Sequence, residues 1–245
     1  MTARRLTAKG EATRRRIVVA AAQLMYERGI TDTTVEDVRA AAGVSGSQVY
    51  HYFADKQALL LAVIDHQTEV VLDLQMPHLD NLDTIAGLRA WRDLLVENQK
   101  RLQCRGGCPI GAIGSQVAET NEDARLAVAS GYLRWETAIR AGLTAMHRRG
   151  DLAADPDDLA LALLTALQGG LLMTQIHRNV RPLETTLDAV LDHIAALTQQ
   201  PARPAPADPP RPPALPGRAR ARDTTPEPLP WTGVFRRTSG RNAGL

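Results

Sequence analysis

Several residue types are scarce in this chain, and their scarcity excludes some classes of protein. Only 4% of the 245 residues are aromatic, although 44% are hydrophobic, a balance that favours aliphatic packing between helices. Alternating apolar and polar runs, the mark of strands, are nearly absent, so we predict an all-α fold. The two cysteines, Cys104 and Cys108, have no histidine or further cysteine at zinc-site spacing. We therefore expect neither a metal nor a cofactor.

Long apolar segments and catalytic motifs are also lacking. The longest apolar run, residues 159–173, is interrupted by Gln168 and is shorter than the roughly 20 residues that cross a bilayer. No apolar segment with a cleavage site precedes Ile17, as a secretory signal requires. The six histidines are scattered without a nucleophile or an orienting partner, which argues against an enzyme. We expect a cytoplasmic protein with no membrane partner and no enzymatic activity.

Charge is nearly balanced overall but unevenly distributed. The formal net charge is only +2. Arginine and lysine predominate in residues 1–16 and again in residues 201–245, which leaves an acidic middle. Such asymmetry is typical of proteins that dock DNA by one face, although solvated basic tails give the same pattern.

Residues 34–53 have the pattern of a helix-turn-helix. Small apolar residues recur at the helical period from Val35 onward, and Thr34 stands before them as an N-cap. Gly43 follows where a helix ends in the left-handed conformation that glycine adopts without strain. A second, short helix then begins at Ser45. Two helices joined by such a turn form the unit whose second helix enters a major groove of DNA.

The second helix presents small and polar side chains at its start. Small side chains let the backbone approach DNA, and longer ones can hydrogen-bond to bases or phosphates. Gln48 lies three residues after Ser45, so it can instead close a capping box on its own helix. Base reading would then rest more on Ser47, His51 and the backbone near Gly46. We predict DNA contacts from Thr34, Ser45, Gly46, Ser47, Gln48, Tyr50 and His51.

Basic residues flank the motif on both sides. Arg14 lies in the first turns of a helix predicted over about residues 11–28, where positive charge opposes the helix dipole and suggests an external phosphate. Lys56 begins a third long helix behind the N-cap Asp55, and a helix start binds anions. We therefore predict that Lys56 and Tyr50 clamp phosphates and that Arg14 also contacts DNA. Simple solvation is the alternative for Arg14 and Lys56.

A resemblance to the DNA-binding domain of the TetR family of transcriptional regulators is carried by residues 17–60, in particular VSGSQVYHYFADKQALL. Gly43, Tyr50, Phe53 and Lys56 fall at the family's spacing without a gap. The later segment GCPIGAIGSQVAE resembles the second domain of the LmrA/YxaF-like subgroup. The resemblance implies a homodimeric repressor in which the last two helices of each subunit pair. An effector bound in the second domain then changes the spacing of the two heads and releases double-stranded DNA.

The chain divides by composition into four segments. We predict a basic arm over residues 1–10, a three-helix DNA-binding head over 11–71, and a helical effector-binding and dimerisation domain over 72–200. Residues 201–245 hold 11 of the 15 prolines, with arginines between them. This composition denies both helix and sheet, so a disordered tail is expected.

Contacts within the second domain are inferred from residue type and from the resemblance. Aromatic and thioether side chains adapt to small apolar ligands, although they also fill ordinary cores. The predicted effector pocket comprises Trp91, Cys108, Tyr132, Trp135, Met146 and Met173. Glycines in the last helices permit close approach of a partner helix. The predicted dimer interface comprises Leu167, Gly169, Gly170, Leu191 and Ile194.

The two cysteines leave a second form of signal input open. Gly106 and Gly107 indicate that Cys104 lies in a loop and that Cys108 begins the next helix, where N-terminal amides would lower the pKa of its thiol. A thiol-based, redox-responsive regulator is therefore one alternative, and a helical adaptor that binds no DNA is another. The main prediction is a sequence-specific DNA-binding transcriptional regulator, a homodimeric repressor released from a palindromic operator by a small-molecule effector.

Overall fold

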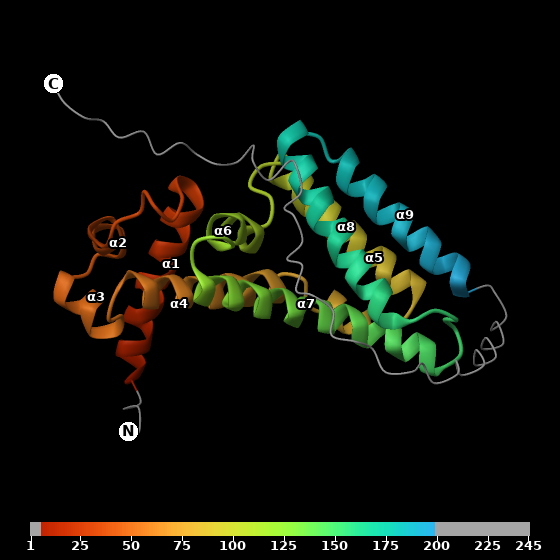
Figure 1. The fold of residues 1–245 in the computed structure, drawn as a ribbon, viewed down its shortest axis with the longest axis horizontal. Helices are drawn as coiled ribbons and strands as arrows, with labels where there is room; N and C mark the ends of the chain where they lie inside the picture. The colour runs from red at the N-terminus through yellow and green to blue at the C-terminus, as the bar shows by residue number, and fades with distance from the viewer. Residues whose placement is uncertain (1–5, 199–245) are drawn as a thin grey trace, which may run out of the picture. The chain divides into compact units, whose positions relative to one another are not determined.

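The computed structural model describes residues 6–198, and all regular structure within them is helical (Figure 1). This confirms the predicted all-α fold. The helices are α1 (Ala8–Arg28), α2 (Val35–Ala42), α3 (Gly46–Tyr52), α4 (Lys56–Asp73), α5 (Ile85–Arg101), α6 (Pro109–Val117), α7 (Glu122–Arg148), α8 (Pro156–His177) and α9 (Arg181–Thr198), with a 3₁₀ helix (His78–Asn81) between α4 and α5. The tail predicted over residues 201–245 lies outside the described residues.

α1 begins earlier than the sequence pattern indicated. Thr7 is its N-cap, and the Thr7 hydroxyl accepts the backbone N–H of Gly10 at 3.2 Å. A cap of this kind stabilises a helix by about 1 kcal/mol, and it starts α1 at Ala8. Part of the basic arm predicted over residues 1–10 is therefore helical, since residues 8–10 belong to α1.

The first four helices enclose an apolar core that holds the helix-turn-helix in place. Ile17 of α1 is fully buried, and Val38 of α2 and Val49 of α3 are almost fully buried. Phe53, which follows α3, is buried with them. Burial of one such side chain stabilises the fold by about 1.5–3 kcal/mol. α3 is thus fixed by its inner side chains, and its outer ones stay available.

α4 continues from the head into the second group of helices, as the sequence predicted, and packs there against α7. Gly131 of α7 is buried where any side chain would collide with Thr68 of α4. The amides of Gln57 and Asn121 donate to each other reciprocally at 3.0 and 2.6 Å. These contacts tie the helix behind the DNA-binding motif to the body of the protein.

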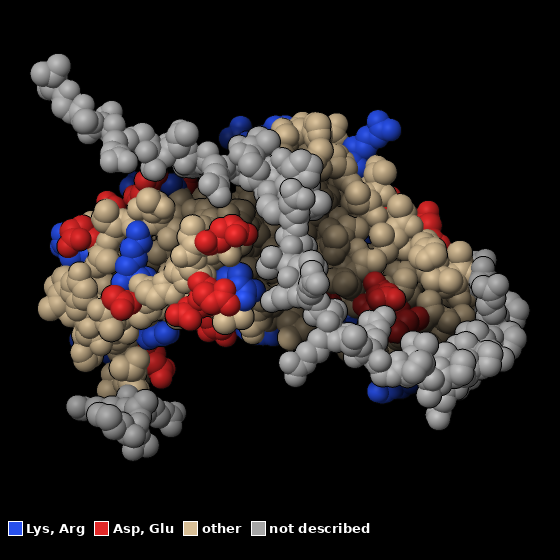
Figure 2. Space-filling view, viewed as in Figure 1, with Lys and Arg blue, Asp and Glu red and all other residues tan. Residues whose placement is uncertain are grey.

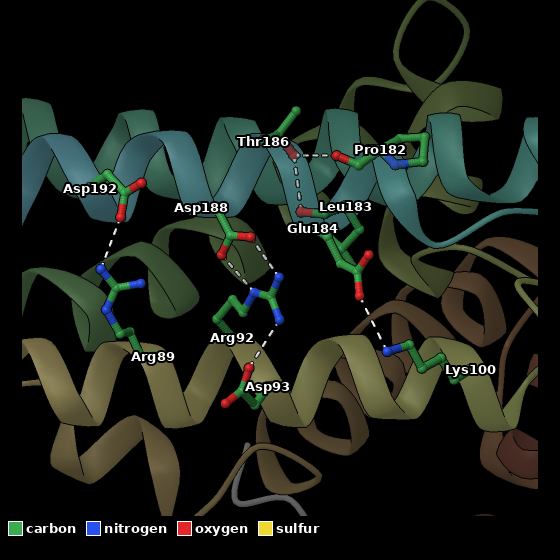
Figure 3. Close-up of polar contacts among 10 residues, drawn as sticks. All are labelled: Arg89, Arg92, Asp93, Lys100, Pro182, Leu183, Glu184, Thr186, Asp188 and Asp192. Atoms are coloured by element: carbon green, nitrogen blue, oxygen red, sulfur yellow. Dashed lines mark hydrogen bonds and ion pairs between the residues drawn. The ribbon is translucent and has the colours of Figure 1, made fainter.

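α9 closes the second domain by packing on α8 and α5. Acidic residues at four-residue intervals along α9 face basic residues of α5 (Figure 3). An exposed ion pair alone contributes only about 0–1 kcal/mol, but a row of them fixes the register of the two helices. The three pairs are Arg89 with Asp192 at 2.9 Å, Arg92 with Asp188 at 2.7 Å, and Lys100 with Glu184 at 3.2 Å.

α8 is both long and apolar. It has 22 residues and a mean hydropathy of 1.6 over its most apolar stretch, so it is long and apolar enough to cross a membrane. The apolar run identified from the sequence, residues 159–173, is a shorter part of this helix. In the structure 44% of that stretch is buried inside the protein, where α8 packs between α7 and α9. These are the contacts of a core helix in a folded domain.

Candidate nucleic-acid interface and ligand cavity

The two helices of the predicted motif are capped by the side chains that the sequence indicated. The Thr34 hydroxyl accepts the backbone N–H of Asp37 at 3.1 Å, and the Asp37 carboxylate accepts the backbone N–H of Thr34 at 3.0 Å. Hydrogen bonds from Thr34 lower the pKa of Asp37. Gly43 ends α2 with φ 63°, in the left-handed region. Local chemistry therefore sets both the start of α2 and the turn that follows it.

α3 opens with a second capping box, between Ser45 and Gln48. The Ser45 hydroxyl accepts the backbone N–H of Gln48 at 3.2 Å, and the side-chain oxygen of Gln48 accepts the backbone N–H of Ser45 at 2.8 Å. Gln48 thus occupies the capping role, which was one of the two roles open to it. The Ser45 hydroxyl also lies 3.0 Å from that of Ser47. The start of α3 is held rigidly by its own side chains.

The outer face of α3 is polar and open to solvent. Tyr50 has 57% of its surface exposed, and Ser47 and His51 are exposed beside it. The His51 ring meets Tyr52 edge-on, with 4.9 Å between the ring centroids. Acidic and basic side chains lie close together on the face of the molecule that Figure 2 shows.

Two predicted phosphate contacts, Arg14 and Lys56, are held in defined positions. The Arg14 guanidinium lies 5.2 Å from the centroid of the Phe53 ring, a cation–π arrangement that anchors it beside the end of α3. The Lys56 ammonium donates to the backbone carbonyls of Ile30 at 2.7 Å and Thr31 at 3.4 Å. Lys56 is therefore not a merely solvated lysine, and its third N–H is free to meet an anion.

Arg39 is a candidate contact that the sequence analysis missed. It is exposed in the last turn of α2, and its Cδ lies where a side chain at Gly46 would come within 3.7 Å. The guanidinium stem therefore runs beside the start of α3. The sequence signal for this contact was an arginine three residues before Ala42, the last residue of α2, and four before Gly43, which ends the helix.

A cavity of about 520 Å³ lies among the helices of the second domain and reaches α1 of the head. Helices α4, α5, α7 and α8 and the loop before α6 contribute to its wall, and α1 contributes Gln23 and Tyr26. Its size lies within the range of small-molecule sites. Two predicted pocket residues, Cys108 and Trp135, line it.

The other predicted pocket residues lie elsewhere. Trp91 is fully buried and donates its Nε1–H to Gln75 at 2.8 Å, behind the wall. The Tyr132 hydroxyl lies 3.2 Å from the side-chain oxygen of Gln168. Met146 is buried in the core, and Met173 is exposed on α8. None of these four residues lines the cavity, so the four predictions are corrected. Side-chain type alone does not distinguish an aromatic or methionine side chain of the core or the surface from a ligand contact.

The thiol of Cys108 has an environment opposite to the one expected from sequence. Cys108 precedes α6 as its N-cap and Cys104 lies in the preceding loop, as predicted. Burial nevertheless raises the pKa of the Cys108 thiol and outweighs the nearby amides of Gly111 and Ile110, which act the other way. The expectation of a lowered pKa is therefore wrong. A protonated and only partly exposed thiol is a poor nucleophile, which weakens the redox alternative.

Two family models match the chain. That of the bacterial regulatory proteins of the tetR family covers residues 17–63, and that of the LmrA/YxaF-like transcriptional regulators, C-terminal domain, covers residues 84–189. The chain belongs to the TetR family of transcriptional regulators. It is accordingly a DNA-binding regulator with a helix-turn-helix, and membership of this family confirms the expectation that it is not an enzyme.

Similar proteins extend the TetR-family match over most of the described residues. The transcriptional regulator AcuR of Cereibacter sphaeroides is 27% identical over 188 residues, which are 75% of this chain and 86% of AcuR. The repressor DhaR of a Mycobacterium species is 25% identical over 190 residues, 76% of this chain and 94% of DhaR. A TetR transcriptional regulator from Chloroflexus aurantiacus, known from its crystal structure, is 27% identical in sequence and superposes with a TM-score of 0.66. The match covers 79% of this chain and 98% of the Chloroflexus chain.

The contacts predicted for the TetR-family dimer need correction at four of five positions. Leu167, Leu191 and Ile194 have no exposed area, and Gly170 is buried against Leu183 of α9. These residues join α8 and α9 within one chain and cannot touch a partner. Gly169 alone is exposed, with open space beside it. The helical period identified an apolar face but could not tell which neighbour covers it.

Proposed function

We propose that this TetR-family regulator is a homodimeric repressor of the cytoplasm that leaves a palindromic operator when a small molecule fills the cavity. One observation carries the proposal. The head helix α1 supplies Gln23 and Tyr26 to the cavity wall, so a ligand there touches the DNA-binding head directly. The sign of regulation is supported by similarity to DhaR, which is named a repressor.

The proposed DNA contacts divide into positioning and reading groups. Tyr50 lies on α3, Arg14 lies beside its C-terminal end, and Lys56 begins the next helix. All three are suited to phosphates, which fix the register of a protein on the duplex without reading sequence. Ser47 and His51 are exposed on α3 and are suited to base edges. Gln48 supports them by holding the start of the helix. Arg39 would add a phosphate contact from α2.

A homodimer is supported by an apolar stripe along α8. Leu161, Leu172, Met173 and Ile176 are each at least 43% exposed, and they recur at intervals that keep them on one side of the helix. Gly169 lies among them with open space beside it. Exposed apolar stripes of this kind mark interfaces. Pairing two such surfaces gives the two heads that a palindromic operator requires.

Release by a ligand requires a physical connection between cavity and head, and α6 supplies one. Cys108 and Pro109, where α6 begins, line the cavity. At the other end of α6, the side chain of Gln116 accepts the backbone N–H of Ile30, just beyond α1. A ligand that moves α6 therefore moves the α1–α2 turn. Such coupling needs different ligand affinities in the bound and free states, commonly about 1–3 kcal/mol.

Two linked measurements test the proposal. The purified protein should select a palindromic duplex from a random pool, and its binding should then fall in the presence of compounds that bind the cavity. Compounds are first found by their stabilisation of the free protein against heat. Selection of no duplex at low salt would overturn the DNA role. Cavity ligands that leave operator affinity unchanged would overturn the release mechanism.

A further inference from the structure

Two buried tryptophan–glutamine pairs lie at the cavity, and they differ in whether their polar atoms have hydrogen-bond partners. In the first pair, Gln75 lines the cavity and Trp91 is buried behind it. Trp91 donates to the side-chain oxygen of Gln75 at 2.8 Å, and the Gln75 amide nitrogen donates to the carbonyl of Val71 at 2.7 Å. Gln75 lines the cavity, and both its amide oxygen and its amide nitrogen have a hydrogen-bond partner. The first pair is therefore satisfied within the chain.

The second set is Trp135 and Gln99, which also line the cavity. Trp135 is 2% exposed and Gln99 is 3% exposed. The Nε1–H of Trp135 and the side-chain oxygen of Gln99 are buried, and neither has a hydrogen-bond partner among the described residues. Buried polar atoms are nearly always paired, so two orphans in one cavity wall, a donor and an acceptor, need a cause. A ligand that supplies the missing partners is such a cause.

The wall offers almost no charge to a ligand. Its polar side chains are mainly amides, and Arg101 is the single charged residue among the described residues that line it. Arg101 is exposed at the end of α5, where water screens it. Burial raises the pKa of both Tyr26 and Cys108, which keeps these groups neutral. An ionised ligand would lose its hydration without gaining a buried counter-charge.

We infer that the cavity takes an uncharged ligand with an apolar frame, a hydrogen-bond acceptor and a hydrogen-bond donor, which pair with Trp135 Nε1–H and Gln99 Oε1 respectively. Primary amides, lactams and phenols have this pairing of groups. This inference rests on the proposed effector role of the cavity. It adds the chemical class of the effector and names the two side chains that select it.

Matched probes test the class directly. 2-Naphthamide, 2-naphthoate and 2-naphthylmethylammonium share one apolar frame and differ in the charge of the polar group. Calorimetry on the full-length protein should show the amide binding at least about tenfold more tightly than either ion. Equal or tighter binding of the carboxylate or the ammonium, or binding of none of the three, would overturn the inference.

Two substitutions of matched size test the assigned residues. Gln99→Met removes the unpaired acceptor and should weaken 2-naphthamide by about three- to tenfold while leaving unsubstituted naphthalene unchanged. The same change should leave the Tm of the free protein unchanged or raise it, because a buried orphan is removed. Gln75→Met breaks two made bonds and should lower the Tm. If Gln99→Met lowers the Tm as much as Gln75→Met does, the side-chain oxygen of Gln99 has a partner within the protein. Gln99 is then not the residue that binds the donor of the ligand.

Operator binding, followed separately by fluorescence anisotropy, distinguishes this inference from the proposed function. If 2-naphthamide binds selectively but leaves operator affinity unchanged, the ligand class stands and the release mechanism fails. If the charged probes bind as tightly as the amide and also release the operator, the mechanism stands and the ligand class fails. Trp135→Phe provides a second check, since it removes the donor and should weaken the amide probe without affecting naphthalene.

Discussion

Gln116 and Ile30 join the body of the protein to its DNA-binding head. The side-chain oxygen of Gln116 in α6 accepts the backbone N–H of Ile30 at 2.8 Å. The carbonyl of the same Ile30 accepts the ammonium of Lys56, at the start of α4. Ile30, in the α1–α2 turn, is thus bonded through its N–H to α6 of the body and through its carbonyl to the start of α4. In the proposed mechanism, a movement of α6 would be passed to Lys56 through Ile30.

Gln116→Leu should uncouple ligand binding from DNA release. Gln116 is exposed, so water can replace the lost acceptor and the Tm should change little. The coupling free energy, calculated from the operator affinities with and without a cavity ligand, should fall by about 0.5–2 kcal/mol, because α6 no longer holds the α1–α2 turn. Fluorescence anisotropy on operator DNA measures both affinities. Ser115→Ala on the same helix is the control, and an unchanged coupling free energy for Gln116→Leu would remove α6 from the mechanism.

Lys56→Met should weaken binding to every DNA sequence by the same factor. The variant loses one positive charge next to DNA, so the slope of log affinity against log salt should fall by about one unit. It also loses the bonds to Ile30 and Thr31, and the Tm should therefore fall. A lower Tm with an unchanged salt slope would mean that Lys56 only supports the turn and contacts no phosphate.

Gln48→Ala should act mainly through the stability of α3. Its side chain closes the capping box with Ser45, and loss of such a cap costs about 0.3–1.5 kcal/mol. Cognate and random duplexes should lose affinity equally. His51→Ala, by contrast, should relax the choice of one base by about 1–3 kcal/mol. Binding to single-base variants of the operator separates the two. Relaxed choice at one position in Gln48→Ala, with no change in Tm, would reassign it as a reader.

The parts of the structure that depend on neighbouring residues were predictable from sequence. Thr34, Gly43 and Ser45 act within four residues of themselves, through caps and one left-handed turn, so their roles follow from residue type and spacing. The order and approximate ends of the helices follow from the same signals. The candidate recognition helix could be identified because most of its determinants are local.

The cavity and the coupling contacts depend on residues far apart in sequence and could not be predicted. Tyr26 and Trp135 meet the same cavity from α1 and α7, and no local pattern records that proximity. The same limit explains Cys108: its neighbours in sequence favour the thiolate, while helices distant in sequence bury it and raise its pKa. α8 is apolar on both sides, so periodicity could not separate Leu167 inside from Leu172 outside.

Cys108 should resist alkylation at neutral pH. In a Cys104→Ala variant Cys108 is the single thiol, and its reaction with iodoacetamide needs the thiolate. The raised pKa means that the folded protein keeps this proton above the pH at which the unfolded chain loses it, so folding stability should fall as pH rises past the ordinary thiol pKa. Alkylation rates of folded and urea-unfolded protein across pH measure the shift. Equal rates at neutral pH would contradict it.

Cys108→Ser separates a structural thiol from a redox sensor. The variant should still release operator DNA on addition of a cavity ligand, because the hydroxyl has a similar size and the proposed response does not use sulfur chemistry. Wild-type protein treated with hydrogen peroxide should keep its operator affinity for the same reason. Loss of DNA binding in peroxide that is absent in Cys108→Ser would instead establish the thiol as the signal input.

Leu172→Asp combined with Ile176→Asp should convert the protein to a folded monomer. Both side chains are more than half exposed on α8, so the substitutions disturb no core within the chain, and circular dichroism should be unchanged. Two buried carboxylates without partners would oppose pairing of the α8 surfaces, and a monomer holds a single half-site. Light scattering after size exclusion measures the mass, and Leu126→Asp, at an exposed leucine of α7, is the matched control. A dimer that survives both substitutions, or one lost equally in Leu126→Asp, would move the interface away from α8.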